Sequence, residues 1–275
     1  MTSVVRDQLR TILRRVRGIA FDMDGVLYRG ERPLPAAAAL LAELAERGIG
    51  FVMVTNNATK TPEEYAAKLS RMGMTVPPER IVTSAIATRD WMRQRYRPGT
   101  TVYVLGMTAL ERAVYDGGYF VRAERDAQVV VNGADFALTY EKLKIATLAI
   151  RAGADWIATN ADRTFPSEEG LIPGSGAIVA ALQAATDRSP IVIGKPEPAM
   201  VLRAADILGI APHELLMVGD RLDTDILAGR RAGAATALVL TGVSSLTEVQ
   251  ASAVRPDIVI DDLQVLLEAV RGEEA

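Results

Sequence analysis

Residues 18–27 read GIAFDMDGVL, a short apolar run that ends in two nearby aspartates. The run from Gly18 to Phe21 has the length and composition of a buried strand. Asp22 and Asp24 follow it directly, and a carboxylate close to the protein interior is unfavourable unless a partner group compensates its charge. The stretch therefore predicts a strand that delivers two functional carboxylates at its carboxyl end.

A second acidic cluster follows a second apolar run far along the chain. Leu215 to Val218 precede the sequence GDRLDTD, residues 219–225. Two strand-end clusters of this kind predict one shared cation site. A cation held by carboxylates favours phosphoryl transfer, in which negative charge on the reacting group has to be neutralised.

Alternation of short apolar runs with helical patterns predicts the fold class. Such alternation is typical of an α/β protein with parallel sheets and right-handed crossovers. Helices are expected over residues 5–17, 35–48 and 61–73, where proline and glycine mark several of the ends. The expected strands are residues 19–21, 50–55, 101–105, 128–131, 156–159, 191–193, 215–218, 235–240 and 257–260.

Composition narrows the classes of function. The chain has 275 residues, 49% of them hydrophobic and 24% charged, with a net charge of -3, so a folded core is expected and nucleic acid is not an expected partner. It has no cysteine, which excludes disulfides and thiolate chemistry and fits a cytoplasmic protein. No apolar run approaches the ~20 residues that span a bilayer. A membrane partner is therefore not expected, although the arginine-rich residues 5–17 leave a membrane-surface helix as an alternative.

Four strand ends carry polar groups that suit phosphoryl transfer. They are Asp22 with Asp24, the sequence TNN at 55–57, GKP at 194–196, and the acidic cluster at 219–225. In open α/β sheets, ligands collect at the carboxyl ends of the strands. Together these groups supply a nucleophile, hydroxyl and amide donors, a lysine and carboxylates for a metal ion.

The ordered set of motifs resembles the haloacid dehalogenase superfamily of phosphatases. The sequences DMDGVL, TNN, GKP and GDRLDTD occur in the order of that family, each after an apolar run. The resemblance spans nearly the whole chain and implies a Rossmann-like core. It also implies a Mg²⁺ cofactor and an aspartyl-phosphate intermediate.

The resemblance assigns roles to the acidic residues. Asp22 corresponds to the nucleophile and Asp24 to the general acid and base. The Asp22 carboxylate, the Asp24 backbone carbonyl and the Asp220 carboxylate would hold Mg²⁺. The dehalogenases of the superfamily lack the second aspartate, so the presence of Asp24 favours a phosphatase.

The remaining motifs are assigned to the phosphate. Thr55 and the Asn56 backbone would bind its oxygens, and Lys195 would neutralise its charge. Asp225 would lie behind these groups and orient Lys195 or metal-bound water. A purely structural role remains the alternative for each residue. It would be a helix cap or turn for the aspartates, a strand-to-helix turn for Thr55 and Asn56, and a surface position for Lys195.

The long segment between TNN and GKP predicts the domain organisation. A core of residues 1–83 and 190–275 is expected, with residues 84–189 inserted as a smaller α/β cap. This insertion resembles the class IIA cap of the p-nitrophenyl-phosphatase-like group. In the cap, Asn160, Asp162 and Ser175 are candidates for contacting the substrate's leaving group, with a plain turn as the alternative.

The resemblance implies a substrate class but no single substrate. Members of the group act on small phosphorylated metabolites: phosphoglycolate, glycerol phosphate, sugar phosphates, nucleoside monophosphates or pyridoxal phosphate. A homodimer is expected, because caps of this group often mediate dimers. Two alternatives remain open, namely a phosphotransferase or mutase with the same site, and a catalytically idle binding protein on this scaffold.

Overall fold

The strand that precedes the paired aspartates lies inside a six-stranded sheet in the computed structural model, which describes residues 3–167 and 169–272. The strand order is β15-β14-β13-β1-β4-β5. These strands are β1 (Gly18–Phe21), β4 (Gly50–Thr55), β5 (Ile81–Thr83), β13 (Leu215–Gly219), β14 (Ala235–Val239) and β15 (Ile258–Ile260).

Strand β1 marks the point where the chain direction across this sheet reverses. It pairs in parallel with β13 on one side and β4 on the other, so that Phe21 lies opposite Val218 and Met53. The chain adds β4 and β5 on one side, and β13, β14 and β15 on the other. Such a switch point leaves a crevice at the carboxyl ends of the strands, and Asp22 follows β1 at that point.

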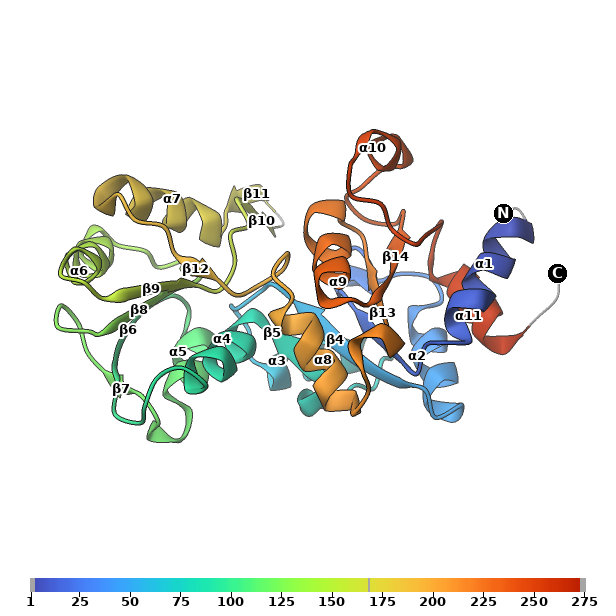
Figure 1. The fold of residues 1–275 in the computed structure, drawn as a ribbon, viewed down its shortest axis with the longest axis horizontal. Coiled ribbons are helices and arrows are strands. Elements are labelled where there is room, and N and C mark those ends of the chain that lie inside the picture. The colour runs from blue at the N-terminus through green and yellow to red at the C-terminus, as the bar shows by residue number, and fades with distance from the viewer. Residues whose placement is uncertain (1–2, 168, 273–275) are drawn as a thin grey trace. The chain divides into compact units, whose positions relative to one another are not determined.

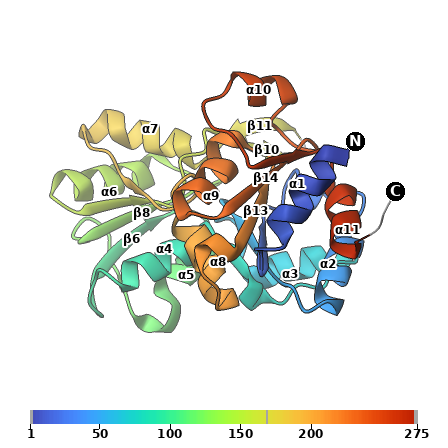
Figure 2. The same cartoon turned by 45° about the vertical axis from the view of Figure 1, so that its right-hand side comes forward.

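Helices cover both faces of this sheet. Ile19 and Phe21 pack into a core with α1, α2, α3 and α11, whereas Gly18 on the opposite face lies against Leu208 of α8. The two helices near the chain ends, α1 and α11, lie side by side (Figures 1 and 2). These helices and their neighbours are α1 (Ser3–Leu13), α2 (Ala37–Glu46), α3 (Pro62–Arg71), α8 (Ala199–Leu208), α9 (Leu227–Ala232), α10 (Leu246–Ala251) and α11 (Leu263–Arg271).

A second sheet, also parallel, is formed by the middle of the chain. Its order is β12-β9-β8-β6-β7, with β6 (Thr101–Leu105), β7 (Val121–Arg122), β8 (Val129–Asn132), β9 (Asp155–Ala158) and β12 (Ile191–Val192). Its helices are α4 (Ser84–Arg93), α5 (Thr108–Tyr115), α6 (Tyr140–Arg151) and α7 (Ser175–Thr186). Two antiparallel pairs complete the strands: β2 (Tyr28–Arg29) with β3 (Arg32–Pro33), and β10 (Thr164–Ser167) with β11 (Gly170–Pro173).

The chain divides into two compact units that correspond to the two sheets. Unit 1 holds Met1–Val54, Pro62–Val82 and Lys195–Ala275, and unit 2 holds Thr55–Thr61 and Thr83–Gly194. The predicted fold class, a parallel-sheet α/β core with an inserted α/β unit, is confirmed. Residues 55–61, 83 and 190–194 were expected in the core but belong to unit 2. For Thr55–Thr61, the hydrogen bonds of Asn56 to Ser84 and Asn160 account for this placement.

All nine expected strands are present, each end within one residue of its predicted position. The N-terminal helix is shorter than predicted and ends at Leu13. In residues 3–167 and 169–272, no helix combines the length and apolar character needed to cross a bilayer.

Candidate active site

Strand pairing brings the two acidic clusters together in unit 1. The backbone amide of Asp22 donates to the Val218 carbonyl at 2.9 Å, which extends the pairing of β1 with β13 by one residue. Asp220 follows the last residue of β13. Carboxylates far apart in sequence are therefore neighbours at one sheet edge, as the strand-end pattern predicted.

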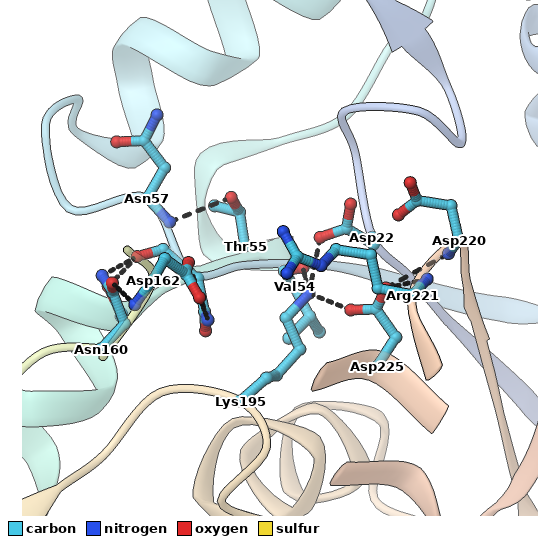
Figure 3. A network of polar contacts seen from close by, with 12 residues as sticks. Asp22, Val54, Thr55, Asn57, Asn160, Asp162, Lys195, Asp220, Arg221 and Asp225 are labelled. Atoms are coloured by element: carbon cyan, nitrogen blue, oxygen red, sulfur yellow. Dashed lines mark hydrogen bonds and ion pairs between the residues drawn. The ribbon is translucent and has the colours of Figure 1, made fainter. Parts of the chain in front are cut away.

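Lys195 lies at the centre of this group. Its Nζ donates to Asp22 Oδ1 at 2.5 Å, Asp225 Oδ1 at 2.6 Å and the Val54 carbonyl at 3.1 Å (Figure 3). The side chain is 2% exposed. Burial lowers the pKa of Lys195, but the charges of Asp22 and Asp225 outweigh burial and raise the pKa above its usual value. The lysine is therefore a fixed cation beside Asp22.

Asp225 is held on both of its oxygens. While Oδ1 accepts from Lys195, Oδ2 accepts from the backbone amides of Asp220 and Arg221, each at 3.1 Å. A π-helical turn, Leu222–Ile226, presents this buried side chain to them. This bonding suits a residue that orients Lys195 and the loop of Asp220.

Asp220 lies against the backbone of the loop that follows β1. Its Oδ2 accepts from the Val243 amide at 2.7 Å. Gly25 has φ +86°, and a Cβ at that position would lie 2.6 Å from Asp220 Oδ2. Only glycine combines this backbone conformation with such a close approach.

The electrostatics of the carboxylates suit a divalent cation. Asp22, Asp220 and Asp225 each offer an oxygen within 4.8 Å of the others. Burial raises the pKa of Asp22 well above its usual value, and Asp225 and Asp220 add to this effect although Lys195 opposes it. Burial and the charge of Asp225 raise the pKa of Asp220 to about 7. Clustered carboxylate oxygens with too little compensating charge are a suitable donor set for a hard cation.

Asp24 is an exposed residue of the loop that follows β1. Partial loss of water raises the pKa of Asp24, while Lys68 and Arg29 counteract the rise. A raised pKa suits a carboxyl group that has to carry a proton near neutral pH. The turn is closed by the Gly25 amide, which donates to the Tyr28 carbonyl at 2.7 Å.

Two neighbours of this loop were not anticipated from the sequence. Lys68 was not considered, yet its ammonium is nearly buried, lies 4.1 Å from the centre of the Tyr28 ring and is 3.3 Å from Glu31. Its position on α3 gave no signal, since a lysine in an amphipathic helix usually faces solvent. The Val54 carbonyl, which binds Lys195, is a backbone group that no side-chain motif reveals.

The TNN segment has its own bonding within unit 2. Thr55 Oγ1 accepts from the Asn57 amide at 3.2 Å (Figure 3). The Asn56 side-chain amide donates to the Asp162 carboxylate at 3.1 and 3.3 Å, and Asn160 Nδ2 donates to the Asn56 carbonyl at 2.7 Å. Two of the three cap candidates thus contact the predicted phosphate-binding segment.

Ser175, the third cap candidate, lies in the interior of unit 2. It is 2% exposed, and its Oγ accepts from Asn132 Nδ2 at 3.3 Å. Asn132 in turn accepts from the Trp156 indole at 2.8 Å. These bonds tie the start of α7 to the second sheet.

The sequence is also similar to protein families and to known proteins. Residues 19–119 match the sequence model of the haloacid dehalogenase-like hydrolases, and residues 192–266 match that of the HAD-hydrolase-like family. An acid sugar phosphatase of Staphylococcus aureus is 42% identical over 251 residues, which are 91% of this chain and 96% of the relative.

Two of the similar solved structures are also phosphatases. A 4-nitrophenylphosphatase from Thermotoga maritima superposes with a TM-score of 0.88 at 35% identity, covering 94% of this chain and 99% of its own. A glycerol phosphate phosphatase from Mycobacterium tuberculosis, solved in complex with calcium, gives a TM-score of 0.86 at 36% identity. That match covers 93% of this chain and 76% of the other.

Proposed function

Because this chain belongs to the haloacid dehalogenase-like hydrolases and is a phosphatase of that family, we propose that it hydrolyses small phosphomonoesters through an aspartyl-phosphate on Asp22. The observation that carries the proposal is the buried bonding of Lys195 to Asp22 and Asp225 beside Asp220. These contacts bring a candidate nucleophile, a buried cation and a cluster of candidate carboxylate metal ligands together at the carboxyl ends of the strands. The relatives' names make sugar phosphates and glycerol phosphate the first candidate substrates.

In the proposed reaction, the Asp22 carboxylate attacks phosphorus and forms the acyl-phosphate bond. The bond from phosphorus to the leaving oxygen breaks, and the Asp24 carboxyl gives that oxygen its proton. The Asp24 carboxylate then takes a proton from water, which attacks the same phosphorus. The bond from phosphorus to the Asp22 oxygen breaks, which frees the Asp22 carboxylate and releases inorganic phosphate. Lys195 holds compensating charge throughout, because its ammonium is fixed beside Asp22.

We assign the carboxylate cluster to Mg²⁺, which the Asp22 and Asp220 carboxylates and the Asp24 backbone carbonyl would hold. When bound, it would neutralise charge on the phosphate and on the carboxylates. The Asp225 oxygens already accept bonds from Lys195 and two backbone amides, so Asp225 is assigned to orienting rather than to ligation. Thr55 and the Asn56 backbone are assigned to the phosphate oxygens. Unit 2 is assigned as the cap.

The proposal is tested by assaying phosphate release from a panel of esters with Mg²⁺ and with EDTA. Sugar phosphates, glycerol phosphate, phosphoglycolate, nucleoside monophosphates and pyridoxal phosphate form the panel, with p-nitrophenyl phosphate as a chromogenic reference. Inorganic phosphate as the product indicates a hydrolase, and a phosphorylated acceptor indicates a transferase. If no ester in the panel releases phosphate, a binding protein on this scaffold is favoured.

Asp22→Asn is the decisive variant for the nucleophile. The amide cannot form the acyl-phosphate, so turnover should fall by at least about 10³-fold, while the melting temperature stays within a few degrees. Circular dichroism and thermal melting confirm the fold, and phosphate release gives the rate. Substantial residual turnover would exclude Asp22 as the nucleophile.

A further inference from the structure

Asn56, the middle residue of the TNN segment, is held from several sides within unit 2. Its carbonyl accepts from Ser84 Oγ at 2.5 Å and from Asn160 Nδ2 at 2.7 Å. Its side-chain amide donates to the carboxylate of Asp162. Ser84 is fully buried and Asn160 is 5% exposed, so these bonds are shielded from competing water.

The contacting loop is itself braced. Asn160 Oδ1 accepts from the Asp162 amide at 3.1 Å, which closes the turn that carries both side chains. The Gly194 amide donates to the Thr159 carbonyl at 2.8 Å. A Cβ on Gly194 would lie 2.5 Å from that carbonyl and 2.7 Å from Asn56 Oδ1, so only glycine permits this approach. Two distant segments, at Ser84 and Asn160, thus hold the Asn56 carbonyl, and Gly194 supports the second of them.

Fixing the Asn56 carbonyl also fixes the amide that follows it. The peptide group is planar, so the direction of the Asn56 carbonyl determines the direction of the Asn57 N–H. That N–H donates to Thr55 Oγ1 at 3.2 Å. A hydroxyl that accepts on one side keeps its proton for an acceptor on another. The bonds from Ser84 and Asn160 therefore reach the Thr55 hydroxyl through a single rigid peptide.

We propose that Asn160 and Asp162 are positioning residues for the phosphate-binding segment Thr55–Asn57, and that they act on the phosphoryl group rather than on the leaving group. The inference rests on the proposed phosphatase function and revises the role that the sequence suggested for this pair. Replacing a residue that acts through the phosphate-binding segment should lower the hydrolysis rate of every phosphate ester by a similar factor. A residue that contacts the leaving group discriminates between esters.

The test compares Asn160→Ala and Asp162→Ala with the unmodified protein. Each variant should lower kcat/KM by a similar factor, about tenfold or more, for p-nitrophenyl phosphate and for glycerol phosphate. The competitive inhibition constant of inorganic phosphate should rise by a comparable factor. Losses that differ strongly between esters, with unchanged inhibition by phosphate, would overturn the proposal and indicate contact with the leaving group.

Two further variants separate positioning from a general loss of structure. Asp162→Asn keeps an oxygen that can accept from the Asn56 amide, so phosphate inhibition should stay within about threefold of the unmodified protein. If Asp162→Asn is as impaired as Asp162→Ala, the hydrogen-bond argument fails. Asp126→Ala removes an exposed aspartate elsewhere in unit 2 and should leave every constant unchanged. A lowered melting temperature with unchanged constants in Asp162→Ala would also overturn the proposal.

Direct phosphate binding keeps this test independent of turnover. The rise in melting temperature on adding inorganic phosphate with Mg²⁺ reports binding even if no ester is hydrolysed. If the unmodified protein binds phosphate without turnover, the proposed function fails, while a smaller phosphate-induced shift in Asn160→Ala still supports the positioning role. An equal shift in both proteins overturns that role.

Discussion

Asp24 differs from Asp22 in its surroundings, and this difference predicts different mutational effects. Asp24 is exposed, whereas Asp22 is bonded to the buried Lys195, so Asp24→Asn should fold normally. Losing the proton donor should slow alkyl esters such as glycerol phosphate by about 10²–10⁴-fold. Nitrophenyl esters should lose much less, because nitrophenolate leaves without a proton.

The ratio of the two losses in Asp24→Asn decides this assignment. It is obtained from single-turnover rates on both esters at one pH. Equal losses would mean that Asp24 does not protonate the leaving oxygen. A loss confined to the dephosphorylation step would place Asp24 only in the activation of water.

At the residue scale, the sequence predicted the groups that carry formal charge. Buried carboxylates and a lysine at strand ends are unfavourable alone, so their positions along the chain already indicated a site. The fold brings Asp22, Lys195, Asp220 and Asp225 into one bonded group. It also places Asn160 and Asp162 on Asn56, which no pattern indicated, because contacts between distant loops depend on the tertiary fold.

Among the structural elements, the loop after β1 offers a test with a matched control. Gly25→Ala forces a side chain into a left-handed conformation and against Asp220 Oδ2, so the loop or the carboxylate has to move. Gly30→Ala meets a similar conformation, φ +58°, with nothing within 4 Å of the new Cβ. The left-handed conformation should lower the stability of both variants by roughly 1–2 kcal/mol. Only Gly25→Ala should also weaken activation by Mg²⁺.

Titration of activity with Mg²⁺ distinguishes the two glycine variants. Gly25→Ala should need about tenfold or more Mg²⁺ for half-maximal activity, whereas Gly30→Ala should match the unmodified protein. Equal Mg²⁺ requirements in the two variants would show that the approach of Gly25 to Asp220 is unimportant for the cation.

The elements that the sequence did not reveal share a physical character. Strands β5 and β7 and the hairpin strands β2, β3, β10 and β11 have two to four residues. Runs of that length show no measurable hydrophobic period, and antiparallel pairs such as β10 with β11 form through tertiary context. The predicted strands β4, β6, β13 and β14, in contrast, have five or six residues and are mostly buried apolar runs, and their ends lie within one residue of the prediction.

For the whole molecule, the raised pKa values predict how stability depends on pH. An unfolded aspartate has a pKa of about 4. In the folded protein the pKa of Asp220 is about 7, so between these values the folded state keeps a proton that the unfolded chain has released. The free energy of unfolding of the metal-free protein should therefore fall as pH rises through this range, by at most about 4 kcal/mol from Asp220.

Urea unfolding in EDTA at pH 5.5 and pH 8 measures this dependence. Asp220→Asn should reduce this dependence, because the amide does not titrate, while the raised pKa of Asp22 leaves part of it in place. Mg²⁺ at pH 8 should restore stability to the unmodified protein and much less to Asp220→Asn. A pH dependence that is the same in both proteins would show that Asp220 titrates normally.

The assignment of Thr55–Thr61 to unit 2 has a consequence for recombining relatives of this chain. A chimera that exchanges only residues 83–194 places the relative's loop, with its counterparts of Asn160 and Asp162, against the Asn56 of this chain. A chimera that carries residues 55–61 along with 83–194 keeps the Asn56–Asp162 and Asn56–Asn160 pairs of one parent. The transferable module of this architecture is therefore discontinuous, and grafts cut at the apparent insertion points alone would inherit mismatched halves of it.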